Sequence, residues 1–206
     1  MNQAQSTAPQ ASFKLSAICE QAGVGPEAFA LIEGDVAPRR YLELLIGHNL
    51  RVDAIKFLAA ALPKRAAVWW ACLCLERLSD YKPTDSETHA LTSARTWVAD
   101  ADSSDQLRRD ALPAAEAAGF GTPAGCTALA AYMSGGSLAP SHLQSVPPAS
   151  HLTAKLVANA LILAGVTQDP AQAPARYDLF LKTGMAVAGG EHPWPQPASS
   201  ESRGTR

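Results

Sequence analysis

The apolar residues of the chain recur at helical spacing. In residues 51–62, five apolar side chains lie three or four positions apart, on one face of an α-helix: Val52, Ile55, Leu58, Ala59 and Leu62. No run of the sequence alternates apolar and polar residues with the period of two that is typical of strands. The pattern therefore predicts an all-α protein.

Residues 64–78 carry apolar side chains on every face between charged ends. A helix of this kind must be surrounded by other helices, so we expect it at the centre of the fold. Trp69 and Trp70 project about 100° apart on a helix. We expect them to pack against two different neighbours as core aromatics, and not to form a ligand platform.

Helix boundaries are marked by proline, glycine and capping residues. Thr84 with Glu87, and Ser103 with Gln106, have the spacing of a capping box, and Ser150 is placed to cap a later helix. Residues 13–18 suit either a short helix or an extended arm. The other predicted helices lie within residues 38–49, 51–62, 64–78, 84–98, 103–118, 122–132, 150–163 and 169–187.

These elements predict a compact antiparallel helical bundle of about eight or nine helices, with a short helical-repeat array as the alternative. Residues 1–12 lack large apolar anchors, so we expect a disordered segment there. Residues 13–190 are expected to form a single helical domain. Residues 191–206, which are rich in proline, are expected to form a flexible tail.

Composition excludes several classes of function. The chain has 206 residues, with 17 Lys and Arg against 19 Asp and Glu, and a net charge of −2 gives no basic field for nucleic acid. The longest apolar run, residues 66–75, is shorter than the roughly 20 residues that cross a bilayer, so no membrane association is expected. Residues 1–12 lack the basic and apolar parts of an export signal, which predicts a cytoplasmic protein.

The four cysteines form no recognisable disulfide or metal-binding pattern. Cys72 and Cys74 point about 200° apart on a helix, and neither Cys19 nor Cys126 lies at ligand spacing from a histidine. We expect reduced, buried thiols, and neither a metal nor a cofactor.

The connection over residues 137–150 contains three prolines and is long enough to form a binding surface. It follows Ser134, Gly135, Gly136 and Ser137, where the glycines are predicted to end a helix. A catalytic pair of Ser134 or Ser137 with His142 is an alternative interpretation, although the strand and first glycine of a nucleophile elbow are missing.

Two arginine pairs and one tryptophan complete the candidate partner-binding residues. Arg39 with Arg40, and Arg108 with Arg109, suit either bidentate bonds to a partner's carboxylate or ordinary solvated positions on a helix. Trp194 lies between two prolines, which makes a stiff segment with an exposed indole. We expect that segment to dock onto this domain or onto a partner.

Three stretches are similar to a known family: IKFLAAALPKRAAVWWAC (55–72), TPAG (122–125) and SGGSLAP (134–140). They resemble an uncharacterised bacterial family of alanine-rich proteins, over about residues 38–190. Its members tend to be encoded near type VI secretion components, which implies an accessory, adaptor or chaperone role in the cytoplasm. The family defines no catalytic residues, so none is carried over.

Two hypotheses of function follow. In the first, the protein is a non-enzymatic interaction module that holds a secretion effector or structural component beside residues 134–148, with an immunity protein as a variant. In the second, it is a small enzyme with a noncanonical site around Ser134, Ser137 and His142. The sequence leaves the oligomeric state open.

Overall fold

A computed structural model describes residues 8–100, 105–140 and 142–193. Within these ranges the chain forms ten α-helices, one 3₁₀ turn and no strand, which confirms the all-α class. The elements are α1 (Ala8–Ala22), α2 (Pro26–Ala30), α3 (Pro38–Gly47), α4 (Arg51–Ala61), α5 (Lys64–Arg77), α6 (Asp85–Ala99), α7 (Asp105–Ala118), α8 (Pro123–Tyr132), α9 (Leu152–Val166), η1 (Pro170–Gln172) and α10 (Ala173–Ala188).

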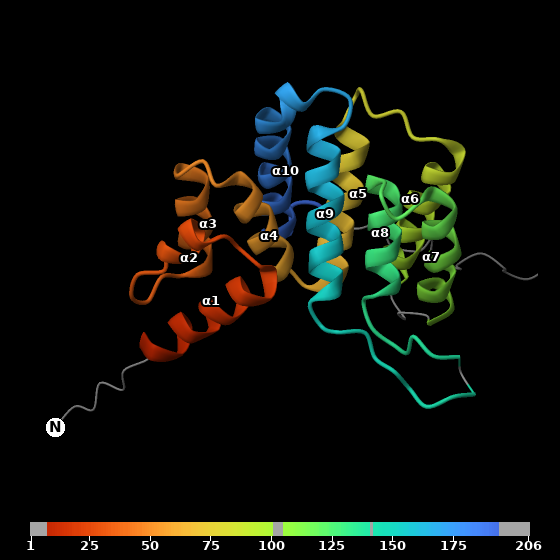
Figure 1. The fold of residues 1–206 in the computed structure, drawn as a ribbon, viewed down its shortest axis with the longest axis horizontal. Coiled ribbons are helices and arrows are strands. Elements are labelled where there is room, and N and C mark those ends of the chain that lie inside the picture. The colour runs from red at the N-terminus through yellow and green to blue at the C-terminus, as the bar shows by residue number, and fades with distance from the viewer. Residues whose placement is uncertain (1–7, 101–104, 141, 194–206) are drawn as a thin grey trace, which may run out of the picture.

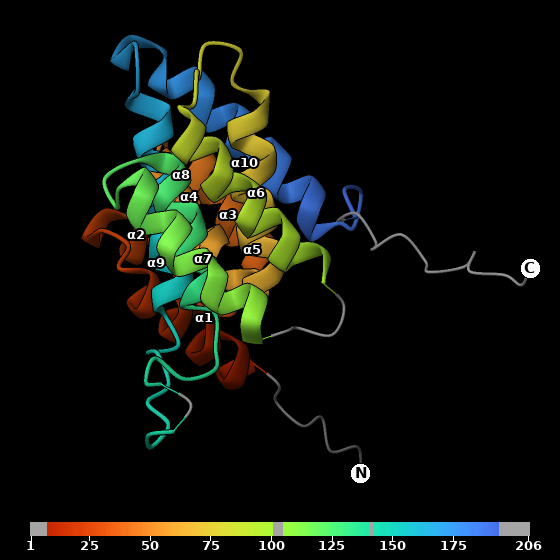
Figure 2. The ribbon, with the colours of Figure 1, turned by 90° about the vertical axis from the view of Figure 1, so that its right-hand side faces the viewer.

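Helix α5 lies at the centre of the bundle, as its uniformly apolar sequence predicts. It packs against α6, α8, α9 and α10, and the views in Figures 1 and 2 show these helices around it. Its two adjacent indoles have different partners. Trp70 Nε1 donates to the Phe180 carbonyl of α10 at 2.7 Å, and Trp69 Nε1 donates to the His192 carbonyl at 2.8 Å. One indole therefore joins α5 to α10, and the other holds the segment that follows α10.

Several predicted helix boundaries are confirmed. The capping box of Thr84 and Glu87 begins α6, and the Thr122 hydroxyl accepts from the Gly125 amide at the start of α8. Gly119 ends α7 with a positive φ of 82°, a conformation that glycine adopts without steric cost. The predicted cap at Ser103 lies outside the described residues, and α7 begins at Asp105.

The N-terminal region differs from the prediction. Helix α1 begins at Ala8, within the segment 1–12 that was expected to be disordered, and Leu15 and Cys19 are buried on it. Pro9 is compatible with this start, because the first turn of a helix needs no amide donor at that position. The short α2 was not predicted, and it raises the number of helices in the described chain above the expected eight or nine.

The starts of α9 and α10 also differ in detail. His151, and not Ser150, is the N-cap residue of α9, and its side chain forms no capping bond. The Asp169 carboxylate accepts from the Ala171 amide, so the turn η1 forms first and α10 begins only at Ala173. A carboxylate that caps the second following amide favours such a tight turn.

The interior contains two kinds of packing. The aromatic core surrounds α5 and includes Tyr41, Phe57, Trp70, Tyr177 and Phe180. The alanine core lies between α6, α7 and α8 and consists of five buried alanines: Ala90, Ala114, Ala115, Ala124 and Ala128. Small side chains let helix backbones approach closely, whereas aromatic rings separate helices and fill the space between them.

The four cysteines, Cys19, Cys72, Cys74 and Cys126, are buried free thiols. Burial raises the pKa of all four thiols, that of Cys72 to about 12. None of the helices in the described ranges has both the length and the apolarity that a bilayer span requires.

Candidate functional site

The connection between α8 and α9 projects from the body of the bundle (Figures 1 and 2). Its part over residues 134–148, with residue 141 outside the described chain, is called the clamped loop below. It contains no helix or strand among its described residues, so side chains and isolated backbone bonds must hold its shape.

Arg108 of α7 fixes the first half of the clamped loop. Its side chain is only 4% exposed, and its guanidinium donates to the Tyr132 carbonyl at 2.7 Å and to the Ser137 carbonyl at 3.1 Å. The same group lies over the Tyr132 ring, 5.0 Å from the centroid. Arg108 therefore joins the end of α8 to the loop that follows it.

Arg109 and Asp105 extend this contact to the surface. Arg109 Nη2 donates to the carbonyls of Ser137 and Ala139, at 3.2 Å each. The Asp105 carboxylate accepts from Arg109 at 2.6 Å and from Arg108 at 2.8 Å. These hydrogen bonds, first the one from Arg109, lower the pKa of Asp105 below its usual range. The carboxylate thus orients both guanidinium groups toward the loop.

Ser137 closes the clamped loop on itself. Its hydroxyl accepts from the amides of Ala139 and Val146 at 3.1 Å each, and the Leu138 amide donates to the Val146 carbonyl at 2.8 Å. The side chains of Leu143 and Val146 nevertheless stay in solvent, with 57% and 52% exposure. Hydrogen bonds therefore link the two sides of the loop across its described residues, and two apolar side chains face solvent.

Gly136 leaves room for the Arg108 side chain to lie against the backbone of the loop. Its φ is 64°, and a Cβ at this position would lie 2.7 Å from both Arg108 Nε and Asp105 Oδ1. Only glycine combines this backbone conformation with so close an approach. Helix α8 ends at Tyr132, as the sequence predicted, but Met133 is its C-cap residue, so the glycine pair does not cap the helix.

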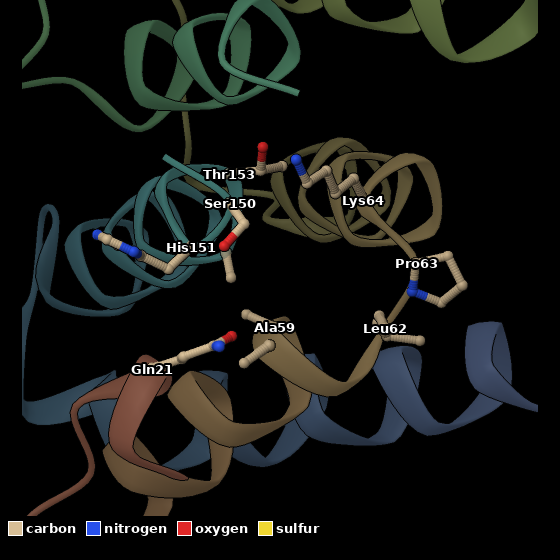
Figure 3. A pocket seen from close by; sticks show the side chains of 10 residues that line it. Gln21, Ala59, Leu62, Pro63, Lys64, Ser150, His151 and Thr153 are labelled. Atoms are coloured by element: carbon tan, nitrogen blue, oxygen red, sulfur yellow. The ribbon is translucent and has the colours of Figure 1, made fainter. Parts of the chain in front are cut away.

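Side chains of α5 and α9 anchor the base of the clamped loop. Lys64 Nζ donates to the Ser134 carbonyl at 2.8 Å, and the Thr153 hydroxyl donates to the Met133 carbonyl at 3.0 Å. Lys64 and Thr153 also line a pocket of about 240 Å³, the junction pocket, where the ends of α1 and α4 meet the starts of α5 and α9 (Figure 3). Its ten lining residues are Gln21, Ala59, Ala60, Leu62, Pro63, Lys64, Ser150, His151, Thr153 and Ala154.

The candidate partner-binding residues predicted from the sequence do not form one site. Arg108, Arg109, Ser134, Gly136 and Ser137 come together at the clamped loop, with Gly135 between them and an exposed His142 farther along. Arg39 and Arg40 lie on α3, where both pair with Glu43 at 3.6 and 3.3 Å. Trp194 lies outside the described residues.

Sequence reasoning missed the polar partners of the loop. Asp105 was detectable, because it precedes Arg108 and Arg109 by three and four residues and so shares their helix face. Lys64 and Thr153 gave no such signal, since they lie 70 and 20 residues from the carbonyls that they bind. No group of three potential metal ligands occurs in the part of the chain that the structure describes.

The chain belongs to a family described as a family of unknown function (DUF6931), whose model matches residues 41–188. This range includes the clamped loop, its arginines and the aromatic and alanine cores, and it agrees with the resemblance to an uncharacterised family. A search of the curated proteins found no match, and neither did a search of the solved structures.

Proposed function

We propose that this member of a family of unknown function is a non-enzymatic cytoplasmic protein that binds a protein partner through the clamped loop. We further propose that it serves as an adaptor or chaperone for a type VI secretion component or effector. One observation carries the first proposal: a loop without secondary structure is held by a buried arginine and exposes two apolar side chains.

The held shape favours binding because ordering a flexible loop at an interface costs free energy. In the clamped loop, Arg108, Arg109 and Ser137 supply that order within the free protein. The exposed Leu143 and Val146 gain stabilisation only when a partner removes them from water. An ordered loop on a rigid scaffold that displays apolar side chains is typical of a recognition surface.

The contacts of Ser137 support the interaction hypothesis over the enzyme alternative. Two backbone amides donate to its hydroxyl, which occupies the lone pairs that an activated nucleophile would use. The hydroxyl thereby acts as a structural group of the loop. The link to type VI secretion is supported by the family resemblance alone, so it is tested by the identity of the partner.

Affinity purification of the tagged full chain from its native host, with mass spectrometry, tests the proposal. We expect one stoichiometric partner that belongs to the secretion apparatus or to its effectors. The double variant Leu143→Lys with Val146→Lys should lose that partner. Val166→Lys is the matched control, because Val166 is an exposed apolar residue at the opposite end of α9.

Each variant should melt within a few degrees of the wild-type protein, since exposed substitutions change stability little. Recovery of the same partner by the double variant would overturn the role of the clamped loop. Purification of the chain alone, under conditions where its expression is native, would overturn the adaptor function.

A further inference from the structure

A second recess lies away from the clamped loop, between α3, α4 and α10. This α3–α4–α10 groove has a volume of about 620 Å³. Its lining is largely apolar and includes Leu42, Phe57 and Leu58, which are buried, and Met185, which is 41% exposed. The volume lies in the range of binding sites for ligands and short peptide segments.

We propose that the α3–α4–α10 groove binds an amphipathic helix of a protein partner, one that carries acidic residues beside its apolar face. This second surface does not depend on the proposed role of the clamped loop. The backbone of the groove walls, the length of the groove and its charges favour this occupant.

The walls favour a helical occupant. They are formed by three α-helices, whose backbone amides and carbonyls are bonded within each helix. An extended peptide would find no open sheet edge to pair with, whereas a helix satisfies its own backbone groups before it binds. Apolar side chains on one face of that helix would then fill the groove.

The length of the groove agrees with two turns of such a helix. Along α10 and its C-cap the lining residues run from Lys182 to Gly189, which are seven positions apart. Seven residues of α-helix span about 10 Å. Anchors at positions i, i+3 or i+4, and i+7 of the occupant therefore match the groove.

The charges around the groove favour acidic flanks on the occupant. Among the residues that line the groove, Arg39 and Lys182 provide two cations, against one carboxylate from Glu191. The Arg39 side chain is 93% exposed, and its only ion pair among the described residues is the contact with Glu43 at 3.6 Å. Helix α3 also begins at this side, with no acidic residue in its first turn to compensate the positive end of its dipole.

A titration of the full chain, labelled with ¹³C at its methionine methyl groups, tests the proposal. The probe is a 14-residue helical peptide with leucines at i, i+3, i+4 and i+7 and glutamates on both flanks. A peptide with lysines in place of the glutamates is its control. Met185 reports on the groove, and Met133, at the end of α8, reports on the base of the clamped loop.

We expect the glutamate peptide to shift the Met185 signal and to leave the Met133 signal unchanged. The lysine peptide should bind about fivefold to tenfold more weakly, the range expected from exposed ion pairs. Lys182→Glu should reverse this preference. Lys155→Glu, a charge reversal at an exposed position on α9 outside the groove, should not.

Three results would overturn the proposal. One is the absence of a Met185 shift at millimolar peptide, and another is equal affinity for both peptides. The third is a wild-type dimer in sedimentation that Met185→Glu dissociates, which would assign the groove to a second copy of this chain. The clamped-loop variant Leu143→Lys with Val146→Lys should titrate like the wild type, so failure of one proposal is distinguishable from failure of the other.

Discussion

The alanine core and the aromatic core bury their helices by opposite means. Between α6, α7 and α8, the buried alanines fill little space, so the helices themselves come close. Around α5, large rings such as those of Trp70 and Phe180 fill the space between more widely separated backbones. The stability of the first core depends on close approach, and that of the second depends on side-chain volume.

Glycine serves each core in a different way. A Cβ on Gly125 of α8 would lie 2.0 Å from the Gly119 carbonyl oxygen, so this glycine lets one backbone touch another. A Cβ on Gly184 of α10 would lie 2.6 Å from Trp70 Cε2, so that glycine makes room for a ring. We therefore expect that substitutions to larger side chains destabilise the alanine core, and that substitutions to smaller side chains destabilise the aromatic core.

Trp70→Ala should have the largest effect of the changes considered. It removes a fully buried indole from the aromatic core and leaves a cavity, and the Phe180 carbonyl loses its hydrogen bond from that indole. We expect a loss of about 4 kcal/mol in the free energy of unfolding, measured by urea denaturation. Trp70→Phe keeps most of the ring volume and should lose clearly less. Equal losses for the two variants would show that volume does not dominate in this core.

Ala115→Leu tests the alanine core in the opposite direction. The added side chain has no space between α6, α7 and α8, and overpacking should cost about 2 to 3 kcal/mol in the same assay. Ala117→Leu is the matched control, because Ala117 is exposed on the same helix. A stable Ala115→Leu protein would mean that these helices separate easily, and the contrast between the two cores would be lost.

Arg108→Gln tests the contribution of the charged residue that continues the buried alanine row of α7. Arg108 lies three residues before Ala111 on the buried face, so a charged side chain continues the row of alanines there. Its loss removes the Arg108 donor from the Tyr132 carbonyl and leaves the Ser137 carbonyl with the Arg109 bond alone, which should cost about 1.5 to 2 kcal/mol. Hydrogen exchange should also rise across the clamped loop.

Arg40→Gln is the control for that substitution, because Arg40 is exposed and pairs only with Glu43 among the described residues. Its effect on the free energy of unfolding should stay below about 0.5 kcal/mol. Unchanged exchange in Arg108→Gln would show that the loop keeps its shape without the buried guanidinium.

The smallest effect concerns pH and Asp105. Because the pKa of this carboxyl is lowered in the folded protein, its contribution to stability is present above pH 4 and is lost as the pH falls through the folded pKa. Asp105 is largely exposed, so the contribution should be below about 1 kcal/mol. Wild type and Asp105→Asn should therefore differ in melting temperature at pH 6 and converge toward pH 3. A difference that grows on acidification would contradict this sign.

The sequence predicted what depends on neighbouring residues. The capping box at Thr84 and the apolar helix α5 are local or periodic signals, and both are present in the structure. Helix α2 was missed because its five residues are too few to show a period. For Arg108, the charged position on a helix was predictable from the sequence, but the burial of its side chain was not. That burial depends on Tyr132 and Ser137, which reach it only once α7 and α8 have packed together.

The burial of the four cysteines makes their thiols probes of local opening of the fold. A thiol reacts with an alkylating reagent as the thiolate, and burial suppresses both access and ionisation at every one of them. The time course of alkylation at each cysteine therefore reports when the helix around that cysteine opens. Alkylation of Cys19 reports the release of α1, that of Cys72 and Cys74 reports the opening of the centre around α5, and that of Cys126 reports the separation of α8. Peptide mapping of the alkylated protein over time therefore ranks the lifetimes of these three closed regions.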